Sequence, residues 1–369
     1  MVLGRWLRRG ARAPGDGAFV AFLTHSAEVQ PVNAGERLFA DTASTRLRVL
    51  IPAAELARRV PVRLVPLARF LADPSLRALG APRAVVIAKL AAGAVAAMER
   101  ELTALLDAVA AGRCPAPVFA DLSDDYAALA DALRAPFLAE YQRRLAEHCA
   151  LTVPCAALRD ALAPLAARGV EVIEDPYESD AAQPVRTRAD DPPALCWFGT
   201  LGAPNADDLR ETLSTLARTM GDGGGRVELV AGEAARAVGT AIAAAVAAAN
   251  PRWSVAYTVW SPESAAAAIA RSDFVLLPQA HATPWGRVKS HNRLVETIRA
   301  GRLALASPIP SYLELAEYAW VGEPLAEGLR WALAHPEEAA ARVARGQAHV
   351  AKRFAPEAIG ARWAQVLGV

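Results

Sequence analysis

The stretch that decides the fold is KSHNRLVETIRAGRLALASPIPSY, residues 289–312. Its apolar residues Leu294, Val295 and Ile298 recur at helical spacing, so the pattern predicts a short helix with one apolar face. Gly301 marks the end of that helix, and an apolar run and a proline-rich turn follow it. A short, wholly apolar strand directly after a helix is typical of a parallel sheet that is covered on both faces.

The same alternation continues outward along the whole chain. Short apolar runs bounded by turn residues alternate with alanine-rich helical stretches, which predicts βαβ units and parallel sheets. The predicted strands of a first series are 18–25, 62–67, 84–90, 117–122, 150–154 and 170–176, and those of a second series are 194–199, 226–232, 254–260, 273–278 and 303–307.

The segment 179–193, SDAAQPVRTRADDPP, separates the two series. It is polar, rich in proline and without periodicity, as linkers are. A chain of 369 residues also favours two domains. We therefore expect an α/β protein with Rossmann-like domains over 1–185 and 186–345, whose parallel sheets face a central cleft. The C-terminal helical segment, 346–369, is expected to pack back on the first domain.

Composition excludes several classes of function. With 53% hydrophobic residues and a net charge of +1, the chain has sizeable cores and no overall field that would attract nucleic acid. No apolar run reaches the roughly 18–20 residues of a membrane helix. The four cysteines lack metal-like spacing and indicate reduced thiols of a cytoplasmic protein. The basic N-terminus, residues 1–17, predicts either a loosely ordered leader or a peripheral contact with the inner face of the membrane.

Residues 289–296 combine groups that suit a nucleotide. Ser290 is the expected N-cap of a helix that begins at His291. Lys289 would lie at the mouth of that helix, where unpaired amide groups favour a diphosphate. Asn292 and Glu296 share a helix face at spacing i,i+4, and Glu296 would accept hydrogen bonds from a ribose. The alternative is an ordinary charged surface helix.

Lys289, Glu296, Ala300–Gly301 and 306–308 together resemble the nucleotide-sugar motif of GT-B glycosyltransferases of the family 4, or "glycosyl transferases group 1", type. The runs WFGTLGAPN (197–205) and WSPESAAAAIARSDFVLLP (260–278) resemble the donor domain of that family, and 119–126 and 151–178 resemble its acceptor domain. The resemblance covers most of residues 18–369. It implies transfer of a sugar from a nucleoside-diphosphate sugar, with retention at the anomeric carbon.

The sequence departs from the family pattern at two places. Val288 stands where many members carry the first glutamate of an E-x7-E motif, and the basic residues after the first donor-domain strand are absent. Backbone amides of the loop after that strand would then hold phosphate. The expected donor site consists of Gly199, Thr200, Gly202, Asn205, His281, Lys289, Asn292, Arg293 and Glu296.

The first domain contributes the expected acceptor and catalytic groups. Arg46 and Arg48 would lie in the first turn of a helix capped by Ser44 or Thr45, where their guanidinium groups suit an acceptor, or else they are solvated arginines. Asp124 and His25 follow strands and, with Lys289, are the expected catalytic residues; a lone histidine there is otherwise structural.

No D-x-D pair is present, so we expect no metal and no cofactor beyond the sugar nucleotide, with cations and a helix dipole stabilising the leaving diphosphate. The acceptor class stays open among glycan, lipid-linked saccharide, natural product and peptide. Two alternative functions also stay open. One is a GT-B nucleotide-sugar epimerase or phosphorylase, and the other is a catalytically degenerate binding or scaffold partner.

Overall fold

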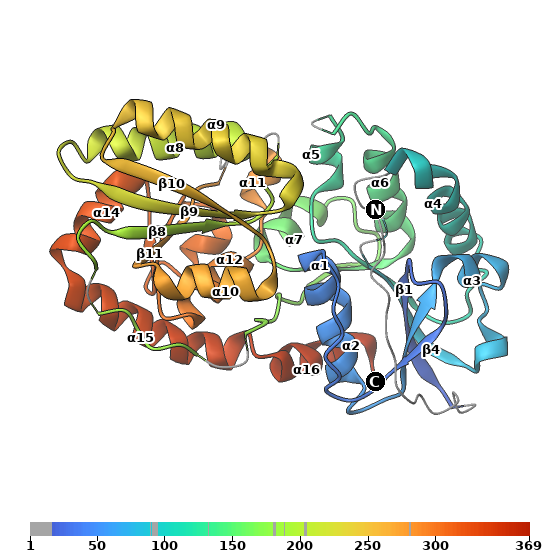
Figure 1. Ribbon diagram of the computed structural model, residues 1–369. Coiled ribbons are helices and arrows are strands. Elements are labelled where there is room, and N and C mark those ends of the chain that lie inside the picture. The colour runs from blue at the N-terminus through green and yellow to red at the C-terminus, as the bar shows by residue number, and fades with distance from the viewer. Residues whose placement is uncertain are drawn as a thin grey trace. The chain divides into compact units, whose positions relative to one another are not determined.

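The computed structural model describes residues 17–88, 90, 95–131, 133–179, 182–187, 189–202, 205–279 and 282–369. The chain forms two compact units (Figure 1). Unit 1 contains the described residues up to Pro176, together with Val288–Ser290 and Phe354–Val369. Unit 2 contains Tyr177–Arg287 and His291–Arg353. The chain therefore passes from the first unit to the second after Pro176, ahead of the boundary expected at residue 185.

The sheet of unit 1 has seven strands in the order β2-β3-β1-β4-β5-β6-β7. All neighbours are parallel except β2 and β3, which are antiparallel. The strands are β1 (Phe19–Thr24), β2 (Gln30–Val32), β3 (Val62–Pro66), β4 (Pro82–Ala88), β5 (Val118–Asp121), β6 (Ala150–Val153) and β7 (Val170–Val172).

Helices and the C-terminal segment complete unit 1. Trp363 of the last helix is fully buried and lies 5.8 Å from the ring of Phe22, so this helix is part of the core of unit 1. The helical elements are α1 (Ala43–Thr45), the π-helix η1 (Arg46–Leu50), α2 (Ile51–Leu56), α3 (Leu67–Ala72), the 3-10 helix η2 (Arg77–Leu79), α4 (Val95–Ala110), α5 (Tyr126–Ala130), α6 (Phe137–His148), α7 (Ala156–Leu162) and α16 (Pro356–Leu367).

The sheet of unit 2 has six parallel strands in the order β10-β9-β8-β11-β12-β13. The chain moves outward from β8 to β10 and then returns to β11 on the other side of β8. This reversal of strand order creates a switch point at the carboxyl ends of β8 and β11, where open α/β sheets bind ligands. The strands are β8 (Ala194–Phe198), β9 (Gly225–Ala231), β10 (Trp253–Val259), β11 (Phe274–Leu277), β12 (Leu303–Ala306) and β13 (Trp320–Val321).

Helices cover both faces of this second sheet (Figure 1). They are α8 (Asn205–Thr219), the 3-10 helix η3 (Glu233–Ala235), α9 (Arg236–Ala249), α10 (Pro262–Arg271), α11 (Pro284–Arg287), α12 (Asn292–Arg299), α13 (Pro310–Leu313), α14 (Leu325–Ala334) and α15 (Pro336–Arg353).

Helix α12 is the helix predicted from the opening stretch, and its apolar residues Leu294, Val295 and Ile298 are all buried. The predicted cap is wrong by one residue. His291 occupies the N-cap position, without a side-chain capping bond, and Ser290 lies outside the helix. Gly301 follows the helix with φ +73°, a left-handed conformation that favours glycine.

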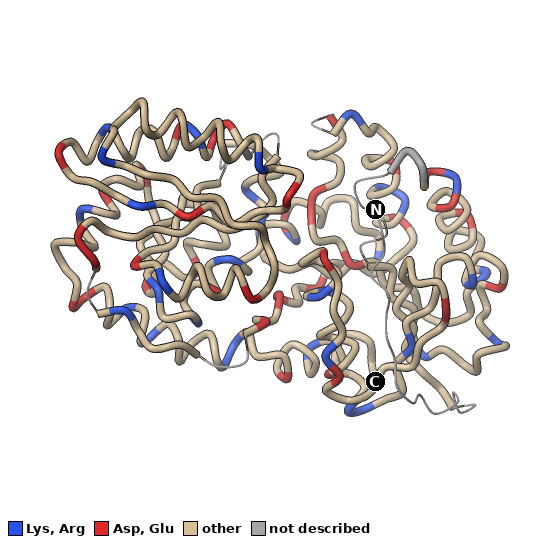
Figure 2. The backbone as a smooth tube through the Cα atoms, viewed as in Figure 1, with Lys and Arg blue, Asp and Glu red and all other residues tan. Residues whose placement is uncertain are grey.

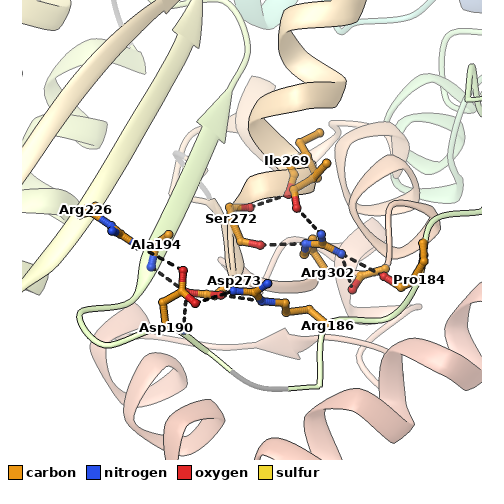
Figure 3. Close-up of polar contacts among 11 residues, drawn as sticks. Pro184, Arg186, Asp190, Ala194, Arg226, Ile269, Ser272, Asp273 and Arg302 are labelled. Carbon is orange, nitrogen blue, oxygen red and sulfur yellow. Dashed lines mark hydrogen bonds and ion pairs between the residues drawn. The ribbon is translucent and has the colours of Figure 1, made fainter.

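The polar linker is anchored at the amino ends of β8 and β11 (Figure 3). Asp273, which is buried just before β11, accepts from Nε of Arg186 at 2.8 Å and from the backbone amides of Asp190 and Ala194 at 3.1 and 2.8 Å. Because one carboxylate receives donors from Arg186, Asp190 and the first residue of β8, these described positions of unit 2 are fixed to one another.

Arg302 completes this anchor from the other side (Figure 3). Its guanidinium is buried and donates to the carbonyls of Ser272 at 2.8 Å, Pro184 at 3.1 Å and Ala300 at 3.0 Å. Ser272 and Ala300 are the C-caps of α10 and α12, so the cation lies at the negative ends of two helix dipoles. These carbonyls accept the hydrogen bonds of the cation, while burial and then the neighbouring Arg186 lower the pKa of Arg302.

Basic and acidic residues are interspersed along both units (Figure 2). This distribution agrees with the net charge of +1. Among the described residues, no helix combines the length and the apolar character needed to cross a membrane. The expectation for the basic leader falls on residues 1–16, which lie outside the described part of the chain.

Candidate functional site

The switch point of unit 2 carries the candidate site. Arg293, the second residue of α12, extends back to the carboxyl end of β8. Its Nη1 donates to the carbonyl of Phe198 at 3.3 Å, and its guanidinium lies 6.0 Å from the ring of Trp197. The N-terminus of α12 is therefore beside the end of β8. The sequence does not predict this contact between the ring of Trp197 and the guanidinium of Arg293.

Gly199 permits this close approach. A Cβ atom at Gly199 would lie 3.2 Å from Nη1 of Arg293 and 3.5 Å from the ring of Trp197, and the residue has φ +153°. A larger residue would displace the guanidinium or strain the loop. The glycine after β8 thus allows Arg293 to lie against the end of the strand.

Among the described residues, two donor groups of α12 have no partner that would neutralise or satisfy them. Arg293 is only partly buried, and no carboxylate in the described part of the chain pairs with it. The Nδ2 atom of Asn292 is buried and has no hydrogen-bond partner among the described residues. A buried donor without a partner is rare in proteins, because it costs about 1–3 kcal/mol. Together with the amides of the first helical turn, these groups suit an anionic oxygen ligand.

Glu296 lies one turn further along α12. Its Oε1 atom accepts a hydrogen bond from the backbone amide of Glu178. Burial raises the pKa of Glu296 to about 7, against the opposing effect of the Glu178 amide. A carboxyl group with this pKa exchanges between donor and acceptor forms near neutral pH. The ribose contact predicted for Glu296 stays a prediction.

For the other expected donor residues, the structure describes fewer contacts or does not describe the side chain. Thr200 is exposed and Gly202 is partly buried in the loop after β8. Asn205 is the first residue of α8, but its side chain lies outside the described part of the structure, as does the whole of His281. Of the nine expected donor residues, the structure brings Gly199 and Arg293 into direct proximity at the switch point, with Asn292 adjacent in α12.

Two of the three expected catalytic residues are in contact in unit 1. Nζ of Lys289 lies 2.5 Å from Oδ1 of Asp124, and both side chains are partly exposed. Val288 is buried in the apolar core of unit 1, and its carbonyl accepts from the thiol of Cys155 at 3.3 Å. His25 has a different partner, because its Nε2 lies 2.9 Å from the carbonyl of Leu90. Lys289 and Asp124 therefore form a pair of opposite charge at the end of β5.

The acceptor role expected for Arg48 does not fit its position. The residue is 1% exposed, and its guanidinium contacts Asp121 at 2.6 and 3.0 Å and Asp175 at 3.1 Å. Burial alone would lower the pKa of Arg48, but the two carboxylates raise it above its ordinary value. The physical reason for the correction is that η1 directs this side chain into the interior of unit 1, where it is the centre of a buried ion-pair cluster.

Arg46 also has an internal role. It is 6% exposed, and its Nη1 donates to the carbonyls of Ala40 at 2.7 Å and Asp41 at 3.1 Å. The helical segment begins at Ala43 with Thr42 as N-cap, so the expected caps Ser44 and Thr45 are wrong. Arg46 consequently holds the loop before its own helix.

Possible metal ligands and two cavities were compared with the switch point as alternative sites. In the ranges that the structure describes, no group of three or more His, Cys, Asp or Glu residues is arranged to hold a metal ion. A cavity of about 550 Å³ lies beside the linker anchor and is lined by residues such as Arg186 and Arg302. Another of about 280 Å³ lies between α16 and the amino ends of β6 and β7. Both are at strand ends opposite to those where parallel sheets bind ligands.

The predicted GT-B fold class is confirmed, because this chain, with its two Rossmann-like units, matches solved structures of that fold over most of its length. The structure of HepE from Anabaena in complex with UDP and glucose is similar to this chain, with a TM-score of 0.65, 13% identity and coverage of 95% of this chain and 99% of HepE.

Two further solved structures share the fold. An E. coli trehalose-6-phosphate structure with bound UDP-2-fluoro glucose has a TM-score of 0.65 at 10% identity, covering 95% of this chain and 98% of the other. The α,α-trehalose-phosphate synthase (UDP-forming) of Burkholderia vietnamiensis has a TM-score of 0.59 at 13% identity, covering 82% and 75%. No protein-family model matches the sequence, and no curated protein matches it either.

Proposed function

We propose that this protein transfers a glycosyl group from a nucleoside-diphosphate sugar to an acceptor. The observation that carries the proposal is the donor-rich N-terminus of α12 at the switch point, where Arg293 has no carboxylate partner in the described chain and Nδ2 of Asn292 has no hydrogen-bond acceptor there. The neighbours with the same fold that hold UDP with glucose, or UDP-2-fluoro glucose, support this choice of ligand.

The proposed chemistry needs positive charge where the diphosphate leaves. As the bond between the anomeric carbon and the diphosphate oxygen breaks, its electron pair goes to that oxygen. Arg293 and the amides of α12 stabilise the developing negative charge. An acceptor hydroxyl forms the new bond to the anomeric carbon and gives its proton to the departing diphosphate oxygen. We propose retention of configuration, no requirement for a metal, and Lys289 and Asp124 as catalytic residues.

Arg293→Met tests the donor site directly. We expect the affinity for a nucleoside diphosphate to fall by about 1.5–3 kcal/mol, the value of a hydrogen bond to a charged group, while the affinity for the matching nucleoside changes little. Isothermal titration calorimetry with UDP, GDP, ADP, CDP and TDP and their nucleosides gives both affinities. Arg236→Met is the matched control, because Arg236 is an exposed arginine of the same unit on α9. Equal losses for diphosphate and nucleoside would contradict the proposal.

A second candidate function is a nucleotide-sugar-binding protein without transferase activity. Val288, which stands at the position of the family's first glutamate, is 7% exposed and packs in the core of unit 1. This burial supports a packing role for that position in place of sugar recognition. A transfer assay with radiolabelled sugar nucleotide separates the two functions. Labelled product that forms only with added saccharide acceptor supports the transferase, and saturable binding without product or hydrolysis supports the binding protein.

A further inference from the structure

A buried histidine lies directly before the candidate diphosphate site. His291 is the N-cap residue of α12 and is 2% exposed. Its side chain does not cap the helix, and its Nε2 atom lies 3.1 Å from Oε2 of Glu314, the C-cap residue of α13. The imidazole therefore connects the beginning of α12 with the end of α13.

The same carboxylate oxygen has a second partner. Nη2 of Arg353, at the end of α15, lies 2.8 Å from Oε2 of Glu314. The contact with His291 and then that with Arg353 lower the pKa of Glu314 to about 2, so the carboxylate is charged across the working range of pH. The carboxylate of Glu314 thus connects the start of α12 with the ends of α13 and α15.

The contact between His291 and Glu314 lies at the start of a short helix. Helix α12 has only eight residues, and its buried apolar residues Leu294, Val295 and Ile298 begin at the third position. Asn292 and Arg293, which carry the candidate donors, come before them. Apolar packing is non-directional, whereas a buried charged contact at the N-cap fixes both the position and the rotation of the first turn.

We propose that His291 is a positioning residue for diphosphate binding. Acting through Glu314, it holds the first turn of α12 so that Arg293 stays beside the end of β8, where its Nη1 contacts the carbonyl of Phe198. This inference rests on the proposed function, because the ligand that it concerns is the diphosphate of the donor. His291 itself does not contact the ligand in this account.

The test compares two substitutions of His291 in calorimetric titrations with UDP and uridine, or with another diphosphate and nucleoside if that pair binds wild type better. His291→Leu removes the contact with Glu314, and the ratio of diphosphate to nucleoside affinity is expected to fall roughly 2- to 30-fold. His291→Gln keeps an N–H donor at a similar distance from the backbone and is expected to recover most of that loss. Glu314→Gln provides an independent test from the other side if His291→Leu does not fold.

A double-mutant cycle with Arg293→Met shows whether His291 acts through Arg293. In the Arg293→Met background, His291→Leu should change the affinity ratio by less than about 2-fold, because the effects of two residues are not additive when one acts through the other. An undiminished, additive effect overturns the positioning role. So does a lowered unfolding temperature with an unchanged ratio, since that is the result of a purely structural histidine. If wild type binds none of the diphosphates, the proposed function itself fails, which is a different outcome from wild-type binding that His291→Leu leaves intact.

Discussion

Arg48→Met should unfold unit 1 selectively. Within the described residues, Arg48 is the one cation that contacts both Asp121 and Asp175, whose side chains are 1% and 8% exposed. The substitution leaves two buried carboxylates without their counter-ion and also removes the donor to the carbonyl of Ile173 at 2.5 Å. Breaking a buried ion pair by removing one partner costs about 3–5 kcal/mol. This is a large fraction of the roughly 5–15 kcal/mol that stabilises a typical domain.

The assay must resolve the two units, because a two-unit protein need not unfold in one step. Hydrogen exchange measured by mass spectrometry over a urea series gives a separate free energy of opening for peptides from β5 and β6 and for peptides from β9. The first set should lose protection in Arg48→Met, and the β9 peptides of unit 2 are the internal control. Arg48→Met with Asp121→Asn should lose less than Arg48→Met alone, since one unpaired charge is removed.

Arg143→Met is the matched control variant. Arg143 is 49% exposed and pairs with Glu140, which is 46% exposed, on the surface of unit 1, so its loss should change the protection pattern little. Unchanged protection of β5 and β6 in Arg48→Met would refute the reasoning that the cluster stabilises unit 1. If Arg48→Met has normal stability and a higher KM for the acceptor, Arg48 binds the acceptor despite its burial.

Three further predictions concern the donor site and its chemistry. Lys289→Ala should weaken nucleoside-diphosphate binding by about 1.5–3 kcal/mol and nucleoside binding little, and calorimetry showing equal losses would contradict the role proposed for that cation. Because burial raises the pKa of Glu296 from 4.5 to about 7, the folded state holds this proton more tightly, so stability should fall as pH rises between these values and stay level above them. Glu296→Gln should remove that slope and add up to about 3 kcal/mol at mildly alkaline pH in urea unfolding, and a slope that persists in the variant would assign it to another group. Turnover should survive EDTA, and loss of activity that Mg²⁺ or Mn²⁺ restores would show that the reaction needs a metal.

The fold class was predictable because buried parallel strands leave wholly apolar runs in the sequence. β8, β11 and β12 all lie within predicted strands and are almost entirely buried. β2 and β13 were not predicted, since strands of three and two residues are too short for a pattern to appear. The same limit applies at helix ends, where the preference of serine for the N-cap placed the start of α12 one residue early.

Side-chain partners were far less predictable than strands. The sequence predicts that Arg48 binds the acceptor or is solvated. Its buried partners Asp121 and Asp175 lie 73 and 127 positions away in the sequence, so a local pattern cannot show them. Lys289 and Asp124 were both selected as functional residues, but their contact, across 165 positions, was not foreseen. Local periodicity determines which face of an element is apolar, whereas pairing of polar groups depends on how strands are ordered in the sheet. Gly199 was partly predictable. The sequence shows a glycine after a strand, but it does not show the contact with Arg293.

The central claim is that unit 2 binds a nucleoside diphosphate at the carboxyl ends of β8 and β11. A crystal structure of the full chain with the best-binding nucleoside diphosphate tests it most directly. The account predicts density for the diphosphate between the loop 199–202 and the N-terminus of α12, with a phosphate oxygen within hydrogen-bond distance of Arg293 and of Nδ2 of Asn292. Density for the ligand at the amino ends of the strands, beside Arg186 and Arg302, with the first turn of α12 unoccupied, would contradict it.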